Sequence, residues 1–286
     1  MEWMQALRTS IDYMEANLLK DCTVEEIAQT VNISPFYFQK GFKIMTGYSI
    51  GEYIRNRRLY LAALDVVKNE EKIIDLAYKY GYDTPESFTK AFSRFHGISP
   101  MQIKVQAYKI KPFQPLQISI SVKGGSQMDY SIEQMEAFQV IGMERIFQYD
   151  SAFDDIPKFW EEYCNKYMNQ YDQELSKCCI GMYGISIDEE MEGKDFRYLI
   201  AGNYKKTTIP EGLTVEKIPA LTFAKFRCVG PMPEAIQAVN TKIFHEWLPG
   251  NAEYEIAAGY NIEMYSKGDT RAVDYVSEIW IPVKKK

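Results

Sequence analysis

Apolar positions in the first part of the chain recur every three or four residues, which is the period of an amphipathic helix. The pattern predicts three helices, over residues 3–19, 23–31 and 49–68. Thr23 followed by Glu26 has the spacing of a capping box at the start of the second helix. Asn32 follows that helix and predicts a tight turn, because Asn tolerates a positive φ better than most residues.

One template then appears twice, at Ser34–Ser49 and again 50 residues later at Thr84–Ser99. Each copy has a hydroxyl residue, a Pro, two Phe four residues apart with a Lys between them, and a Gly near its end. The hydroxyl residue can cap a helix that has Pro in its first turn, the Phe pair forms a buried stripe, and the Gly ends the helix. We therefore predict two helix-turn-helix units joined by the helix over residues 49–68.

Beyond residue 128 the pattern changes to strands and helices, and it is duplicated again. D-Y-S-I-E-Q-M-E-A-F-Q-V-I-G-M matches G-L-T-V-E-K-I-P-A-L-T-F-A-K-F 83 residues later, and the closing strands match at an offset of 79. We interpret each copy as β-α-β-β. The predicted fold class is multidomain: an all-α double helix-turn-helix domain followed by an α+β domain of two pseudo-symmetric β-α-β-β units. A cleft between such halves is a natural ligand site.

These patterns place the domain boundaries. Residues 1–108 form the first domain and residues 128–286 the second. The stretch 109–127 contains two Pro and two Gly without helical periodicity, so it is predicted to be a linker.

Composition narrows the function classes. The chain of 286 residues is 46% hydrophobic and 25% charged, which are globular values. It has no apolar run near the length of a bilayer span and no signal-peptide pattern, which predicts a cytoplasmic protein without a membrane partner. The five Cys do not form a disulfide or metal-ligand pattern, and phosphate-loop, dinucleotide and G-x-S-x-G fingerprints do not occur. We predict no cofactor, no metal and no catalytic residues.

The net charge of −6 is unevenly distributed. Residues 1–112 carry 15 Lys and Arg against 13 Asp and Glu, whereas residues 113–286 carry 18 against 26. A weakly basic first part and an acidic second part are consistent with a DNA contact in the first part alone. The polar and cationic residues on the outer side of the two template helices favour the same interpretation.

The first part resembles the DNA-binding domain of the AraC/XylS family of transcription regulators. The resemblance rests on I-A-Q-T-V-N-I-S-P-F-Y-F-Q-K-G-F-K, on Y-I-R-N-R-R-L-Y-L-A, and on L-A-Y-K-Y-G-Y-D-T-P-E-S-F-T-K-A-F-S-R-F-H-G-I-S-P. It implies seven helices, double-stranded DNA as the partner, and two recognition helices in successive major-groove segments. By family tendency it also implies activation of transcription with RNA polymerase.

Carried over by position, the resemblance and the local pattern give the residues predicted to contact DNA. They are Phe36, Tyr37, Gln39, Lys40, Lys43 and Arg55 in the first unit and the helix after it, and Thr84, Glu86, Ser87, Thr89, Lys90 and Arg94 in the second. Gln suits adenine, and Lys suits guanine or phosphate. Glu86 would repel phosphate and accept only from a cytosine amino group. Arg57 and Arg58 cluster near Arg55, where they could also touch phosphate.

The second part resembles the GyrI-like small-molecule-binding domain found in multidrug-responsive regulators, with S-E-I-W-I-P-V near the end as its most specific motif. Glu278 and Trp280 share one face of the last strand, where the first copy has Leu199 and Ala201. A carboxylate beside an aromatic residue suits a cationic or amphipathic effector. The resemblance implies a ligand-pairing Glu at position 278. The further predicted ligand contacts are Trp160, Tyr163 and Tyr183.

Other interpretations remain open at this point. Glu278 could face solvent on an edge strand, or it could serve as the general base of a hydrolase. A third possibility is that the cleft holds a segment of a partner protein. His96 and His245 do not form a pair and are interpreted as structural or surface residues.

Overall fold

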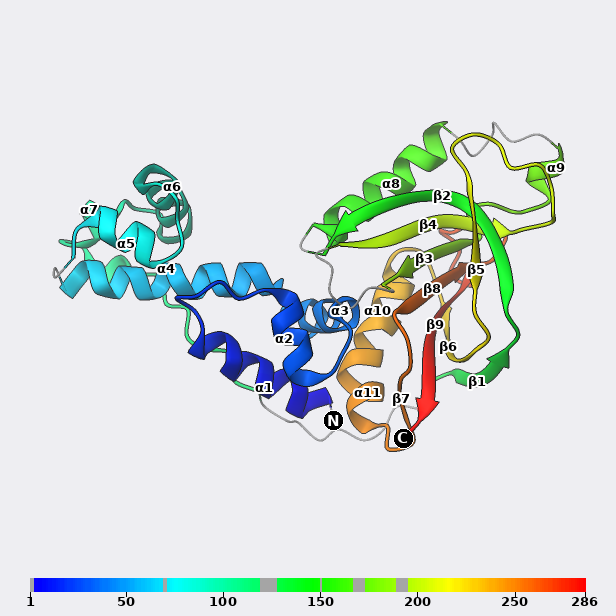
Figure 1. The fold of residues 1–286 in the computed structure, drawn as a ribbon, viewed down its shortest axis with the longest axis horizontal. Coiled ribbons are helices and arrows are strands. Elements are labelled where there is room, and N and C mark those ends of the chain that lie inside the picture. Colours follow the sequence, from blue (N-terminus) through cyan, green and yellow to red (C-terminus); the bar gives the residue numbers. More distant parts are fainter. Residues whose placement is uncertain (1–2, 69–70, 119–127, 150, 167–172, 189–194) are drawn as a thin grey trace. The chain divides into compact units, whose positions relative to one another are not determined.

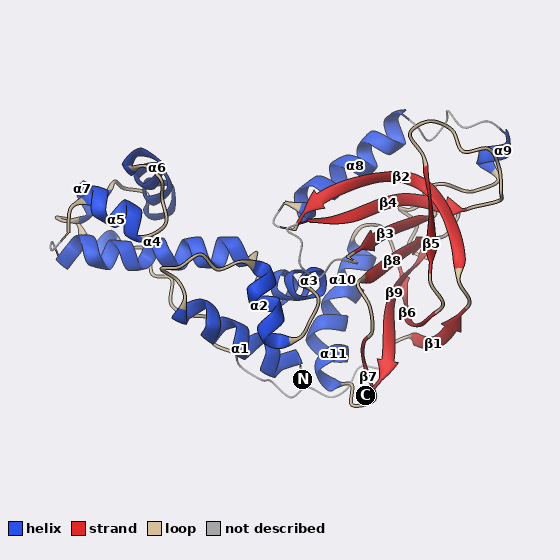
Figure 2. Cartoon of the chain, viewed as in Figure 1, coloured by secondary structure: helices blue, strands red, loops and turns tan. Residues whose placement is uncertain are grey.

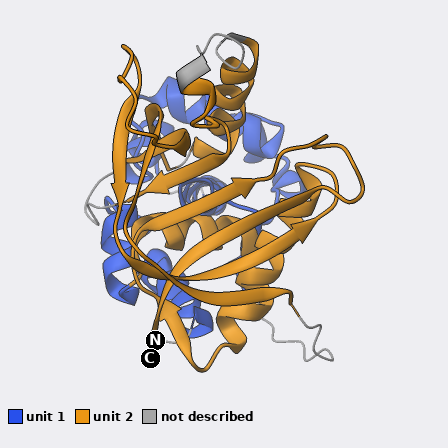
Figure 3. Cartoon of the chain, turned by 90° about the vertical axis from the view of Figure 1, so that its right-hand side faces the viewer, with its two compact units in different colours: residues 1–32, 46–121 blue, residues 33–45, 122–286 orange. Residues whose placement is uncertain are grey.

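The computed structural model describes residues 3–68, 71–118, 128–149, 151–166, 173–188 and 195–286. They form two compact units, which Figure 3 colours separately. Unit 1 comprises residues 1–32 and 46–121, and unit 2 comprises residues 33–45 and 122–286. Residues 119–127 of the predicted linker lie outside the described residues. The domain boundaries at 108 and 128 stay a prediction.

Unit 1 is built from helices (Figures 1 and 2). They are α1 (Trp3–Ala16), α2 (Val24–Val31), α4 (Ile50–Lys68), α5 (Ile73–Lys79), α6 (Pro85–His96), α7 (Pro100–Ile103) and the 3₁₀ turn η1 (Ala107–Lys109). The predicted capping box of α2 is confirmed: Glu26 N–H donates to Thr23 Oγ1 at 3.2 Å, and Thr23 N–H donates to the Glu26 carboxylate at 3.0 Å. Asn32 takes the left-handed conformation that the predicted turn requires, with φ 53°.

One apolar core of unit 1 lies between α4, α5, α6 and α7 and includes the fully buried Phe88 and Phe92. His96 at the end of α6 closes this core. Its Nε2–H donates to the Leu59 carbonyl at 3.1 Å, which leaves Nδ1 to accept the Lys111 N–H at 3.1 Å. Burial lowers the pKa of His96, so the neutral form that makes both bonds is favoured. His96 is therefore a buried structural residue that ties residue 111 to the core.

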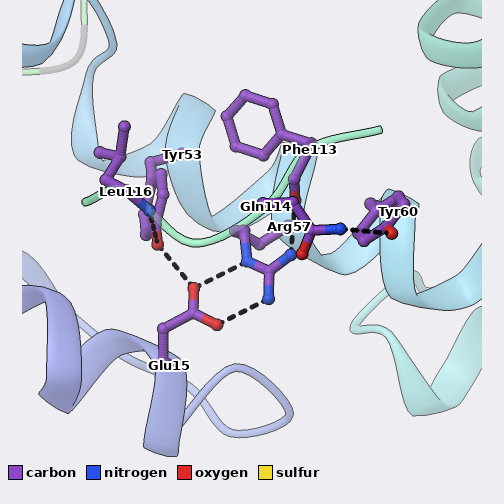
Figure 4. Close-up of polar contacts among 7 residues, drawn as sticks. All are labelled: Glu15, Tyr53, Arg57, Tyr60, Phe113, Gln114 and Leu116. Atoms are coloured by element: carbon purple, nitrogen blue, oxygen red, sulfur yellow. Dashed lines mark hydrogen bonds and ion pairs between the residues drawn. The ribbon is translucent and has the colours of Figure 1, made fainter. Parts of the chain in front are cut away.

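A second tie holds the chain after η1 against α4 (Figure 4). Arg57 donates to both oxygens of the Glu15 carboxylate, at 2.8 and 2.7 Å, and also to the Phe113 carbonyl. Tyr53 OH donates to Glu15 at 2.6 Å and lies 3.5 Å from the Leu116 N–H. We call Glu15, Tyr53 and Arg57 the clamp. Because the clamp binds backbone groups of residues 113–116, the start of the predicted linker is fixed on unit 1.

Unit 2 contains one antiparallel sheet (red in Figure 2). Its strands are β1 (Tyr130–Met135), β2 (Phe138–Gln148), β3 (Tyr183–Ile187), β4 (Asp195–Asn203), β5 (Thr214–Ile218), β6 (Leu221–Val229), β7 (Tyr254–Ile256), β8 (Tyr260–Tyr265) and β9 (Val276–Lys285). The order is β1-β6-β9-β8-β3-β4-β2-β5, with β7 paired to β9. The predicted class, helices followed by an antiparallel α+β domain, is confirmed.

The two halves of the sheet are related by the predicted duplication, with β3 and β8 side by side at the centre, where Ile185 pairs with Ile262. The matched segments are strand pairs, β1 with β2 and β5 with β6, so each copy begins with one strand more than the predicted β-α-β-β, and the second copy also has the short strand β7. The break falls at residues 136–137 in the first copy. Each copy also exchanges its first strand: β1 pairs with β6 and β5 pairs with β2.

The helices of unit 2 are α3 (Pro35–Thr46), α8 (Ala152–Lys166), α9 (Gln173–Ser176), α10 (Glu234–Lys242), the π-helical turn η2 (Ile243–Trp247) and α11 (Leu248–Gly250). Helix α8 contacts β2, and α10 contacts β6 and β9. On the other face of the sheet, Ile185, Leu199, Ile262 and Trp280 belong to one apolar cluster. Among the described residues, no helix is both long enough and apolar enough to cross a membrane.

Candidate DNA-reading helices and effector cavity

Helix α6 presents the second copy of the template as the sequence predicts. Thr84 Oγ1 accepts the Ser87 N–H at 3.1 Å as the N-cap, and Gly97 ends the helix at φ 78°. Phe88 and Phe92 are buried below the helix. The outer side is polar and open: Glu86, Ser87, Lys90 and Arg94 are exposed and Thr89 is half-buried.

Helix α3 presents the first copy differently. Ser34 Oγ accepts the Tyr37 N–H at 3.3 Å, and Phe38 and Phe42 are buried with ring centroids 6.0 Å apart. The side of α3 that was predicted to face outward is not exposed to solvent. Its residues Phe36, Tyr37 and Gln39 are buried and Lys40 and Lys43 are half-buried, all as part of unit 2.

The arginines of α4 also differ among themselves. Arg55 is exposed. Arg57 is engaged by the clamp, and Arg58 donates to the carbonyls of Leu18 and Lys20, at 2.5 and 2.7 Å. Of the three, Arg55 is therefore the one whose side chain is available for a phosphate.

A cavity of about 1030 Å³ lies in unit 2. Its walls are α3, α8, α10, the inner strands β3, β4 and β8, and the segment that follows β8. Aromatic side chains supply much of the surface: Phe36, Tyr149, Phe153, Trp160, Tyr163, Phe196, Tyr198, Tyr265 and Tyr275. The size and the aromatic lining suit a small organic molecule.

The cavity contains one carboxylate among its described lining residues, that of Glu263 on β8. Tyr265 OH donates to this carboxylate at 2.8 Å, and the Glu263 side chain is 22% exposed. Gly184 stands opposite Glu263 on β3, where a Cβ would lie 2.3 Å from Tyr198 OH. The absent side chain therefore leaves room for Tyr198 beside the carboxylate.

The aromatic rings around Glu263 are held by hydrogen bonds. Trp160 Nε1–H donates to Tyr198 OH at 2.8 Å, and the Trp160 ring meets the Tyr265 ring edge to face at 5.2 Å. Burial, reinforced by the Glu263 charge, raises the pKa values of Tyr198 and Tyr265, so both hydroxyls stay neutral. The site thus combines one anionic group with fixed aromatic faces.

Of the five ligand contacts that the sequence predicts, two lie in the lining of the cavity and three do not. Trp160 and Tyr163 line the cavity, with Tyr163 OH donating to the Ile180 carbonyl at 2.8 Å. Glu278, Trp280 and Tyr183 do not belong to its lining.

Strand register explains the division. Glu278 pairs with Met264, one residue from Glu263, and neighbouring residues of a strand point to opposite faces. On its own face Glu278 accepts the Trp280 indole N–H at 2.5 Å, and the Trp280 ring lies 5.9 Å from that of Tyr183. A ligand role for Glu278 stays a prediction; the structure places this residue outside the cavity.

The sequence carried a signal for Glu263 that the strand comparison overlooked. Glu263 is the one acidic residue of the central strand β8, and it lies opposite a Gly in the equivalent strand of the first copy.

Other chemistry is sparse in the described part of the chain. No group of three or more His, Cys, Asp and Glu could hold a metal ion there. The five Cys are free thiols. His245 is exposed, and its Nε2 lies 3.4 Å from the Ile44 carbonyl.

Comparison with known proteins agrees with this organisation. Residues 16–105 match the model of a helix-turn-helix domain, and residues 131–283 match that of the integron-associated effector binding proteins. The helix-turn-helix domain is of the AraC type, and together the two domains define a ligand-regulated transcription factor. The chain belongs to the family of integron-associated effector binding proteins, which matches more than half of its length.

The relatives of the first domain are transcription regulators. The activator AarP of Providencia stuartii is 36% identical over 88 residues, which are 31% of this chain and 65% of AarP. The regulatory protein SoxS of Salmonella typhimurium (strain LT2) is 32% identical over 94 residues, which are 33% of this chain and 88% of SoxS. The chain therefore spans slightly less than two thirds of AarP.

For the second domain, the structure of SAV2435 bound to tetraphenylphosphonium is 22% identical. It covers 55% of this chain and 94% of that one, with a TM-score of 0.47.

Proposed function

We propose that this protein is a cytoplasmic transcription activator whose effector is a lipophilic organic cation bound beside Glu263. The observation that supports the effector class is the half-buried carboxylate in an aromatic cavity. Partial burial makes the charge of a carboxylate costly, and a cation of low hydration beside it relieves that cost. Aromatic faces add about 0.5–2 kcal/mol for each well-placed cation–π contact.

The DNA side of the proposal rests on α6, whose polar outer face is open, and on Arg55. The predicted base-reading roles of Phe36, Tyr37, Gln39 and Lys40 apply when α3 is free of its contacts in unit 2. RNA polymerase is proposed as the partner of the DNA-bound protein. We propose binding and not hydrolysis as the activity of the cavity, because the relatives of the first domain are transcription regulators.

The effector class is tested by calorimetric titration of the full chain with tetraphenylphosphonium and with triphenylphosphine oxide, a neutral molecule that carries the same rings. The cation is expected to bind at least about tenfold more tightly, which corresponds to about 1.4 kcal/mol. Equal affinities would show that the cavity recognises ring shape and not charge.

The DNA interface is tested with Lys90→Ala on α6, using duplex DNA that the protein selects from a random library. Loss of one phosphate contact is expected to lower affinity and to reduce the slope of log K against log salt by about 0.9. Lys217→Ala is the matched control, since Lys217 is an exposed Lys on β5 of unit 2. Unchanged affinity and slope for Lys90→Ala would remove Lys90 from the interface.

A further inference from the structure

The closed face of α3 is held by specific polar contacts within unit 2. The buried Asp188 carboxylate accepts the Phe36 N–H at 3.1 Å, in the first turn of α3. Tyr37 OH donates to the Tyr260 carbonyl at the start of β8. The residue after Tyr260, Asn261, is buried, and its Oδ1 accepts Lys40 Nζ at 3.0 Å. The first turn of α3 and the side chains of Tyr37 and Lys40 thus each have a hydrogen-bond partner elsewhere in unit 2.

Lys40 brings the contact into the cavity. Its Nζ lies 3.9 Å from Glu263 Oε1, and its side chain is 12% exposed. Burial lowers the pKa of Lys40, and the charge of Glu263 opposes that shift. Lys40 therefore occupies, from within the chain, the position that a cationic ligand of Glu263 would take.

The two copies of the template differ at the residues that make these contacts. Where α3 has Phe36 and Tyr37, α6 has the exposed polar pair Glu86 and Ser87. The Phe36 ring packs on that of Phe196 with centroids 5.1 Å apart. An adjacent pair of aromatic side chains at the start of a recognition helix is explained by this packing, because it gives apolar surface a buried partner.

The side chain of Gln39 is in an unfavourable environment while α3 forms part of the cavity wall. Its side chain is 5% exposed and lines the cavity, and its amide nitrogen has no hydrogen-bond partner among the described residues. A buried donor without an acceptor is unfavourable. Gln39 is also the predicted adenine reader, so the helix gains a partner for it on leaving the cavity wall.

We propose that α3 forms part of the wall of the effector cavity and detaches from it when the effector binds. Lys40 is then an internal counter-ion of Glu263 that a lipophilic cation displaces. Displacement frees the face of α3 that reads DNA, so the effector raises DNA affinity. This inference rests on the proposed function of the cavity. The coupling is reciprocal: DNA that captures α3 opens the site to the effector.

The first arm of the test is hydrogen–deuterium exchange of the full chain, with and without saturating tetraphenylphosphonium. Exchange is expected to rise in peptides from α3 and to stay unchanged in peptides from α6, the matched helix. Lys40→Met is expected to bind tetraphenylphosphonium about tenfold more tightly, since the competing cation is gone, and triphenylphosphine oxide as before. Unchanged or slower exchange in α3 with the cation bound overturns the proposal, as does weaker binding by Lys40→Met.

The second arm needs no effector. Asp188→Ala removes the acceptor for the Phe36 N–H, and also that for the hydroxyl of Tyr149 in the cavity lining, and it leaves the predicted DNA-reading side chains unaltered. It is expected to raise affinity for the selected DNA several-fold, whereas the exposed Asp195→Ala is the control and leaves it unchanged. Lower or equal affinity in a variant with an unchanged circular dichroism spectrum overturns the proposal. If tetraphenylphosphonium does not bind the full chain, the proposed effector class fails, and this arm still decides whether α3 is withheld from DNA.

Discussion

Replacing Glu263 with Gln is expected to weaken tetraphenylphosphonium binding to the full chain by about 30-fold, which corresponds to about 2 kcal/mol. The substitution keeps the shape of the side chain and its contact with Tyr265, so the loss reports the charge. A value at the lower end of the range for buried charge pairs is appropriate because Glu263 is 22% exposed. Calorimetric titration measures the loss directly.

Glu278→Gln is the matched control, since Glu278 is a half-buried carboxylate on the neighbouring strand that points to the other face of the sheet. It is expected to change tetraphenylphosphonium affinity less than twofold. Triphenylphosphine oxide should bind all three proteins alike. A large loss in Glu278→Gln with none in Glu263→Gln would instead support the role that the sequence resemblance implies for Glu278.

Arg57→Met is expected to destabilise unit 1 by about 3 kcal/mol, among the largest effects of a single substitution outside the apolar core. The variant leaves the Glu15 carboxylate without its bidentate partner and the Phe113 carbonyl without its donor. Urea unfolding of the full chain, followed by circular dichroism at 222 nm where the helices dominate, measures the shift of the helical transition.

The control is Arg55→Met, two residues earlier on the same helix, where the side chain is exposed. A surface substitution of this kind usually changes stability by no more than about 0.5 kcal/mol. Equal midpoints for the two variants would show that the clamp does not stabilise unit 1. The Arg55 variant should in turn bind DNA more weakly, because Arg55 is proposed to contact phosphate.

The helices of unit 1 were predictable because their determinants are local. Thr23 with Glu26, Asn32, Thr84 and Gly97 each act on backbone groups within one helical turn. The buried stripe of α6 follows from the spacing of Phe88 and Phe92. By contrast, Arg57 of the clamp binds Glu15 and Phe113, which are 42 and 56 positions away in the sequence, and no local pattern predicts such contacts.

The cavity was predictable in part. The duplication indicated two related halves, and Trp160 and Tyr163, two of the predicted ligand contacts, line the cavity. The strand that carries the carboxylate was not identified, because the side of the sheet on which a residue lies depends on register. Glu263 and Glu278 differ by one step of that register, and a single step reverses the face.

The sequence by itself determined the order of the two domains, the capped helices of unit 1, the duplication in each part and the class of ligand-regulated transcription factor. These properties depend on the spacing of residues along the sequence, which can be read without the tertiary structure. The tertiary structure decided which carboxylate faces the cavity and which of the two template helices keeps its polar side open. Those outcomes depend on strand pairing and on contacts such as that of Asp188 with Phe36, which lie 152 residues apart.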